Sequence, residues 1–132
     1  MQLNPLVPEL LVSDFDRSLR FYVEGVGFSV AFTRSGPAFA YLDLAGAQLM
    51  IEADHPGAWS TGELIGARGR GSNLQIEVPD VRAVRARLLE LACSPFRELH
   101  ESWYDTPVGS EGQLEYLVQD PDGYLIRLVQ IL

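Results

Sequence analysis

Arg127 is a charged residue on the apolar face of a predicted strand near the end of the chain. The stretch YLIRLVQIL follows a DPDG turn and alternates as strands do, so that Leu125, Arg127 and Val129 share one face. A guanidinium keeps its charge, so in an apolar setting it requires an acidic partner or an anionic ligand. The strand-like segment LMIEA carries one carboxylate, Glu52, that could face the same side.

The elements that position these residues follow from two similar segments. VPELLVSDFDRSLRFYVEGVGF begins at Val7, and NLQIEVPDVRAVRARLLELAC begins at Asn73. Each predicts a short strand followed by a helix, with Asp14 and Asp80 as the N-caps. Strand-like runs follow each helix: residues 28–34, 39–44 and 49–53 in the first half and, after a longer irregular stretch, residues 114–119 and 124–131 in the second. Each half therefore predicts the order βαβββ.

Neither half is large enough to cover its sheet alone, so the halves should combine. We expect one α+β domain in which two βαβββ modules, residues 1–54 and 72–132, pair into a curved, cleft-forming sheet with the helices outside. The Gly-rich residues 55–71 would be the linker. In the opening strands Leu10, Val12 and Ile76 mark the core face. The other face carries Glu9 in the first strand and Asn73 and Gln75 in the second, and is polar enough to line a cleft.

Composition narrows the function classes. The chain has 132 residues, 47% of them hydrophobic, which is ample for a folded core. A net charge of −8, with every basic residue an Arg, argues against nucleic-acid and anionic membrane partners and favours a neutral or cationic ligand. The single Cys93 excludes an internal disulfide and a cysteine-cluster metal site. The sequence shows no signal-peptide pattern and no long apolar run, so we expect a cytoplasmic protein.

The doubled βαβββ pattern, the opening VSDFDRSLRFYVEGVGF and the ending DPDGYLIRLVQ resemble the vicinal oxygen chelate superfamily, which includes glyoxalase I, extradiol dioxygenases, and fosfomycin and bleomycin resistance proteins. The resemblance covers nearly the whole chain. It implies four positions at which metal-dependent members place ligands, matched here by Val7, Glu52, Asn73 and Arg127. Only Glu52 is a good ligand, and Arg127 would put a positive charge beside the cation. The two histidines do not supply the missing ligands, because His55 is predicted in the linker and His100 in the irregular stretch. We therefore expect no metal and no cofactor.

The metal-free bleomycin resistance proteins resemble this chain best. The resemblance implies that Arg127 takes the place of the metal and pairs with Glu52. It also implies a homodimer that sequesters a cationic or aromatic compound, such as a bleomycin-like antibiotic, without catalysis. Those relatives often have Trp before the Gly of the loop that leads into the seventh strand, whereas this chain has Glu111 before Gly112, a departure that bears on specificity for bleomycin itself.

Aromatic residues complete the expected ligand site. Trp59, Trp103 and Tyr104 are predicted in loops, where ligand stacking and packing remain equally open. The full predicted ligand-binding set is Glu9, Glu52, Trp59, Asn73, Gln75, Trp103, Tyr104, Tyr116 and Arg127, with no catalytic residue. Two alternatives remain. The first is an enzyme, which would be either a lyase or dioxygenase with displaced metal ligands such as Glu9, Glu52 and Glu115, or a metal-free isomerase with Glu9 as base. The second is a dimeric module without a ligand.

Overall fold

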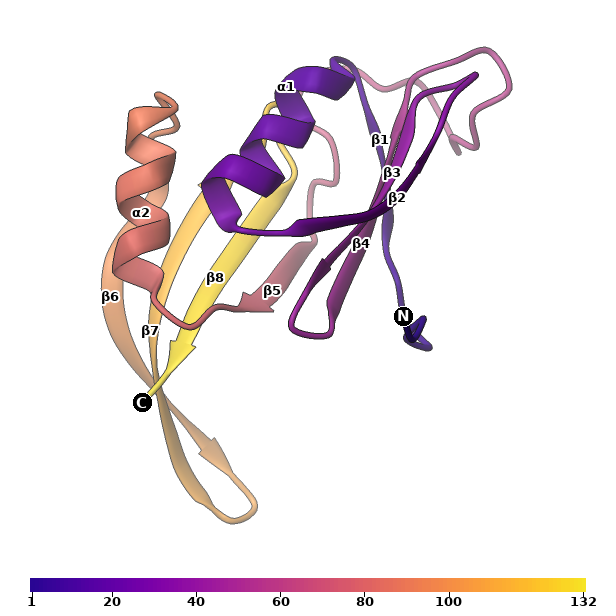
Figure 1. The fold of residues 1–132 in the computed structure, drawn as a ribbon. Coiled ribbons are helices and arrows are strands. Elements are labelled where there is room, and N and C mark those ends of the chain that lie inside the picture. Colours follow the sequence, from indigo (N-terminus) through magenta and orange to yellow (C-terminus); the bar gives the residue numbers. More distant parts are fainter.

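The computed structural model describes residues 1–132 as two four-stranded sheets and two helical segments (Figure 1). The first module contains β1 (Glu9–Val12), α1 (Phe15–Arg20), its π-helical continuation η1 (Phe21–Val26), β2 (Ser29–Arg34), β3 (Phe39–Leu44) and β4 (Ala47–Ala53). The second contains β5 (Asn73–Glu77), α2 (Val81–Glu90), β6 (Pro95–Thr106), β7 (Gly109–Gln119) and β8 (Leu125–Ile131).

The two sheets have the same topology. Sheet A has the strand order β1-β4-β3-β2, and sheet B has the order β5-β8-β7-β6. In each sheet the opening strand runs parallel to the closing strand, and the other pairs are antiparallel. The predicted α+β architecture of two βαβββ modules is therefore confirmed.

Both helices begin where the sequence predicts. The Asp14 carboxylate accepts a hydrogen bond from the Arg17 backbone N–H at 3.1 Å, and the Asp80 carboxylate accepts one from the Ala83 N–H at 3.1 Å. Each cap satisfies a backbone donor that the first helical turn leaves free. Neither helix is long and apolar enough to cross a membrane.

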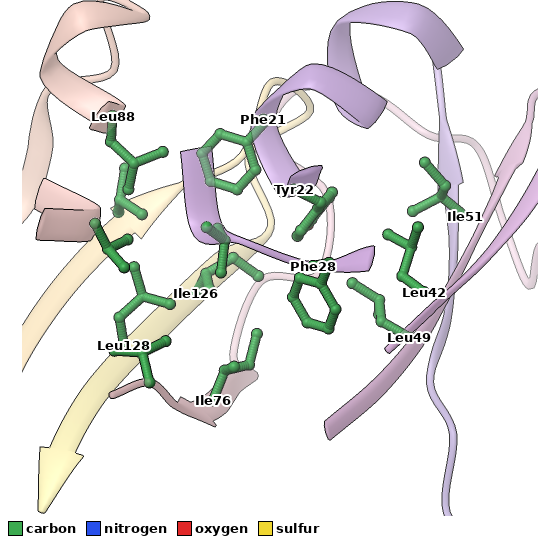
Figure 2. Packing of buried hydrophobic residues seen from close by; sticks show 14 of the residues in the cluster. Phe21, Tyr22, Phe28, Leu42, Leu49, Ile51, Ile76, Leu88, Ile126 and Leu128 are labelled. Carbon is green, nitrogen blue, oxygen red and sulfur yellow. The ribbon is translucent and has the colours of Figure 1, made fainter. Parts of the chain in front are cut away.

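One hydrophobic core serves both modules. Figure 2 shows Phe21 and Phe28 between Leu42 of sheet A and Ile126 of sheet B, and all belong to one buried cluster. The helix α1 lies between the two sheets, whereas α2 covers sheet B (Figure 1). Each sheet thus turns one face to the shared core and leaves the other, its open face, on the outside.

The helices of the two modules approach closely at Gly25. A Cβ added at Gly25 would lie 2.5 Å from Leu88 Cδ2, so any larger residue here would displace this buried side chain of α2. The Arg87 Nε donates to the Gly25 carbonyl at 3.0 Å, which satisfies an acceptor near the end of η1. The two modules are therefore joined by polar as well as apolar contacts.

The stretch after α2, predicted to be irregular, is largely a strand. β6 pairs with β7 from Pro95 to Thr106, and the hairpin they form extends beyond the end of β8 (Figure 1). Two register shifts interrupt its regular alternation, which explains why the sequence pattern was missed. The TPVG turn at residues 106–109 was the available signal for a hairpin.

Arg68 ties the linker to both modules. Its guanidinium donates to the two Asp54 carboxylate oxygens at 2.8 and 2.7 Å and to the Leu11 carbonyl at 2.9 Å. Its backbone N–H donates to the carbonyl of Asp122, in the turn before β8, at 3.0 Å. The bidentate ion pair between Arg68 and Asp54 closes the base of a loop that contains residues 55–67.

Candidate functional site

A pocket on the open face of sheet A gathers three residues of the predicted site. It encloses about 250 Å³ and is lined by Glu9, Arg34, Glu52, His55, Gly57 and Trp59. The strands β1 and β4 supply the two glutamates, and the loop closed by Arg68 supplies His55 and Trp59. The structure thus brings Glu9, Glu52 and Trp59 together.

The pocket holds two carboxylates and one guanidinium, that of Arg34. Glu52 lies 3.4 Å from the Nε2 of His55, whereas Glu9 has no ion-pair partner. The Arg34 guanidinium lies over the Phe39 ring, 3.9 Å from its centroid, an arrangement that stabilises the cation. Trp59 is 91% exposed, so its indole is free to cover a bound molecule. This arrangement can attract a cation and stack on an aromatic ring.

The neighbouring part of sheet A has an aromatic surface that ends at a polar network. Phe32 and Tyr41 stack with ring centroids 5.0 Å apart. Tyr41 and the Asn4 backbone N–H donate to the side-chain oxygen of Gln48 at 2.6 and 2.8 Å, and the Gln48 amide donates to the Gln2 carbonyl at 2.7 Å. The N-terminal segment is therefore fixed beside this end of the open face.

Sheet B carries a second polar cluster, centred on Glu115. This carboxylate is 2% exposed; its Oε2 lies 2.6 Å from Arg127 Nε, and its Oε1 accepts from the Tyr104 hydroxyl at 2.6 Å. His100 Nε2 lies 3.5 Å from the same Oε1. Burial alone would raise the pKa of Glu115, but hydrogen bonds from Ser102 and Tyr104 and the charge of Arg127 outweigh it and lower the pKa below the usual value. Glu115 is therefore a carboxylate in the folded protein at neutral pH.

The predicted ion pair between Arg127 and Glu52 is wrong. Arg127 pairs with Glu115, and Glu52 lies beside His55, 3.4 Å from its Nε2. The reason is topological: Arg127 lies on β8 and Glu115 on the adjacent β7, both in sheet B, whereas Glu52 belongs to sheet A. The pocket beside Glu52 is lined by residues 9–59 only.

The remaining predicted site residues are distributed over sheet B. Asn73 and Gln75 lie on the outer strand β5, with Gln75 in register with Arg127. Trp103 and Tyr104 lie in β6, not in loops, and as successive strand residues they face opposite sides. Tyr104 contacts Glu115, whereas Trp103 packs against Gly112.

Tyr116 does not belong to the site. It is 0% exposed and part of the shared core, so a ligand contact at this position is ruled out. The strand β7 alternates, and the register that turns Glu115 to the open face turns Tyr116 inward.

Sequence reasoning missed three residues. His55 and His100 are predicted in irregular segments, yet they lie next to Glu52 and Glu115. Arg34 was not considered, although it ends a predicted strand. The short separation of Glu52 and His55 was a usable signal once the chain was expected to turn after β4.

The residues present do not fit a divalent metal of the kind that the resemblance implies. No group of three His, Cys, Asp or Glu side chains is arranged to hold an ion. Of the four matched positions, Val7 has no donor atom, and the Arg127 cation is bound to Glu115.

Comparisons with known proteins show where the chain belongs. Residues 2–128 match the model of the Glyoxalase/Bleomycin resistance protein/Dioxygenase superfamily, and the chain is a member of that family. Comparison with curated proteins found no match.

Solved structures share the fold at low sequence identity. They include a virulence protein from Salmonella typhimurium (20% identity, TM-score 0.64, covering 100% of both chains) and TioX from Micromonospora sp. ML1 (22%, 0.64, covering 96% of this chain and 98% of that one). Another is the fosfomycin resistance protein FosX from Listeria monocytogenes (16%, 0.64, covering 97% and 91%). At these identities the likeness establishes the fold alone.

Proposed function

We propose that this protein is a metal-independent binding protein that sequesters a small cationic or aromatic molecule, such as the cationic group of a bleomycin-like antibiotic, in the pocket on sheet A. The observation that supports this most directly is that Glu9, Glu52 and the exposed Trp59 all line the same pocket. A desolvated cation would gain from both carboxylates, and an indole face stabilises a cation as well as a flat ring.

The electrostatics of the chain support the same class of ligand. The net charge of −8 attracts cations at long range, and salt screens this field beyond roughly 8 Å at physiological ionic strength. Selectivity must therefore come from the local charges, where Glu9 lacks an ion-pair partner. Arg34 is held on Phe39 and offsets only part of the acidic charge.

We also propose that the protein works as a homodimer. The open faces of the two sheets lie outside the shared core, so a second chain could cover one without disturbing the fold. Sedimentation at micromolar concentration should give about twice the chain mass of 14.6 kDa. A monomer over the same concentration range would contradict this.

A thermal-shift experiment on chelator-treated protein tests the ligand class. Bleomycin and benzylamine are the cationic probes, and benzyl alcohol is a neutral probe of similar shape. We expect the cations to raise Tm in a concentration-dependent manner and benzyl alcohol to have little effect, because a ligand that binds only the folded state stabilises it. Equal shifts with the charged and neutral probes would contradict a cation site.

Paired variants locate the site. Glu9→Gln combined with Glu52→Gln removes both carboxylates with little change of shape and should abolish the shift with benzylamine. Glu63→Gln makes the same kind of change in the exposed part of the linker and should leave the shift unchanged. Loss of the shift in the Glu63 variant as well would indicate a general charge effect and would overturn the assignment.

A further inference from the structure

The outer edge of Arg127 has no protein partner. Its Nε lies 2.6 Å from Glu115 Oε2 in an ion pair without hydrogen-bond geometry, and no hydrogen bond of the structure involves either terminal nitrogen. The side chain is 26% exposed, so these nitrogens lie at the open face of sheet B. An arginine has five donors in a fixed plane, and those on the outer edge remain available here.

The neighbours of Arg127 hold its guanidinium in place. Glu115 is almost fully buried and is itself fixed by the Tyr104 hydroxyl, so it is a rigid anchor for one side of the cation. The Tyr104 ring lies 5.5 Å from the guanidinium carbon and provides an aromatic wall. A guanidinium held in this way loses little side-chain entropy when it binds a ligand.

The next strand supplies a second donor at the same place. Gln75 on β5 is in register with Arg127, on the open face, and is exposed. Its side-chain amide can donate to an acceptor that is bound at the outer edge of Arg127. The donors on β8 and β5 therefore border the same part of the surface.

We propose that the open face of sheet B is a binding site for an oxyanion, the carboxylate or phosphate group of a small molecule, which the two terminal nitrogens of Arg127 grip in bidentate fashion beside Gln75. Carboxylate and phosphate oxygens match the spacing of the guanidinium fork. This site is separate from the pocket on sheet A, and it does not depend on the function proposed for that pocket.

The chain is acidic, so the charges close to Arg127 decide whether an anion can bind there. Glu115 neutralises Arg127 from the buried side, and Glu77, two residues beyond Gln75 on β5, is exposed to solvent. Distant negative charges are screened within about 8 Å in physiological salt. At that ionic strength the attraction between the anion and Arg127 should therefore outweigh repulsion by the net negative charge of the chain. In very dilute buffer the repulsion should dominate and binding should weaken.

NMR titration with benzoate and with inorganic phosphate tests the site. Either probe should shift the side-chain Nε–H signal of Arg127 and the amide signals of Gln75 with one saturating curve. Shifts with benzoate alone would identify a carboxylate site with an aromatic requirement, and shifts with both would identify a general oxyanion site. If neither probe shifts these signals at millimolar concentration, the proposal is wrong.

Matched variants separate recognition from folding. Arg127→Lys keeps the charge but loses the fork and should raise the Kd about tenfold. The double variant Glu115→Gln with Arg127→Gln removes both charges together, avoids a stranded carboxylate and should abolish binding while remaining folded. Arg82→Gln, at an exposed position of α2, should leave the Kd unchanged. Equal affinity in the wild type and the double variant would overturn the proposal.

Discussion

The Nε of Arg127 lies 2.6 Å from the Oε2 of Glu115, a carboxylate that is 2% exposed. Replacing Arg127 with Ala would leave that carboxylate buried without its arginine partner, and should reduce the free energy of unfolding by about 2 kcal/mol. A double-mutant cycle with Glu115→Gln, measured by urea denaturation, should give a smaller loss for the double variant than the sum of the single losses.

The same cycle with Glu52→Gln in place of Glu115→Gln is the control. Because Glu52 belongs to sheet A, its effect and that of Arg127→Ala should add within about 0.5 kcal/mol. Coupling to Glu52 but not to Glu115 would contradict the observed pairing.

The stabilisation from Glu115 should depend on pH. Its folded-state pKa is lowered. Burial alone would raise this pKa, but hydrogen bonds from Ser102 and Tyr104 and the charge of Arg127 lower it by more than burial raises it. A lowered pKa stabilises the fold above the unfolded-state pKa of about 4.3, and this stability is lost as the pH falls through the folded-state pKa. The difference in unfolding free energy between the wild type and Glu115→Gln should therefore shrink below about pH 4. A difference that stays constant into acid would show that the interaction does not depend on the charge of Glu115.

Arg68 should contribute to stability and to the order of the loop that carries Trp59. Arg68→Ala removes hydrogen bonds to Asp54 and to the Leu11 carbonyl and should cost about 1–2 kcal/mol. Amide hydrogen exchange should speed up in residues 55–67. Arg70→Ala, which removes contacts to backbone carbonyls within the exposed linker, should change stability by less than about 0.5 kcal/mol. Equal effects of the two variants would rule out a special role for Arg68.

The contact between the helical segments should not tolerate a methyl group at Gly25. In Gly25→Ala the new Cβ would lie 2.5 Å from Leu88 Cδ2 in the packed core, which should cost about 1–3 kcal/mol. Gly62→Ala is the matched control, because no atom lies within 4 Å of its added Cβ. Thermal unfolding should show a lower Tm for the first variant only. A tolerated Gly25→Ala would mean that η1 and α2 pack less closely than the structure shows.

Local patterns predicted most of the fold. Asp14 and Asp80 were recognisable as caps because capping depends on residues three positions apart, and Leu10, Val12 and Ile76 showed the core face through simple alternation. The strand β6 was missed because its register shifts break that alternation. Local signals of this kind act within a few residues.

The candidate site was predicted less well because its contacts join distant residues. Glu9, Glu52 and Trp59 were expected in one place and lie in one pocket, but Arg127 was assigned to the wrong carboxylate. An ion pair on an open sheet face depends on strand order and register, which neither residue type nor spacing reveals. Only the placement of β7 beside β8 identifies Glu115 as the partner of Arg127.

Isothermal titration of chelator-treated protein with a cationic aromatic ligand tests the central proposal most directly. If the pocket on sheet A is a metal-independent site, benzylamine or bleomycin should bind metal-free protein with the same Kd as untreated protein, and the variant with Glu9→Gln and Glu52→Gln should lose binding. Elemental analysis of the same untreated sample should find no stoichiometric divalent metal. Binding that disappears on chelation and returns with one metal ion per chain, or that survives loss of both glutamates, would contradict the proposal.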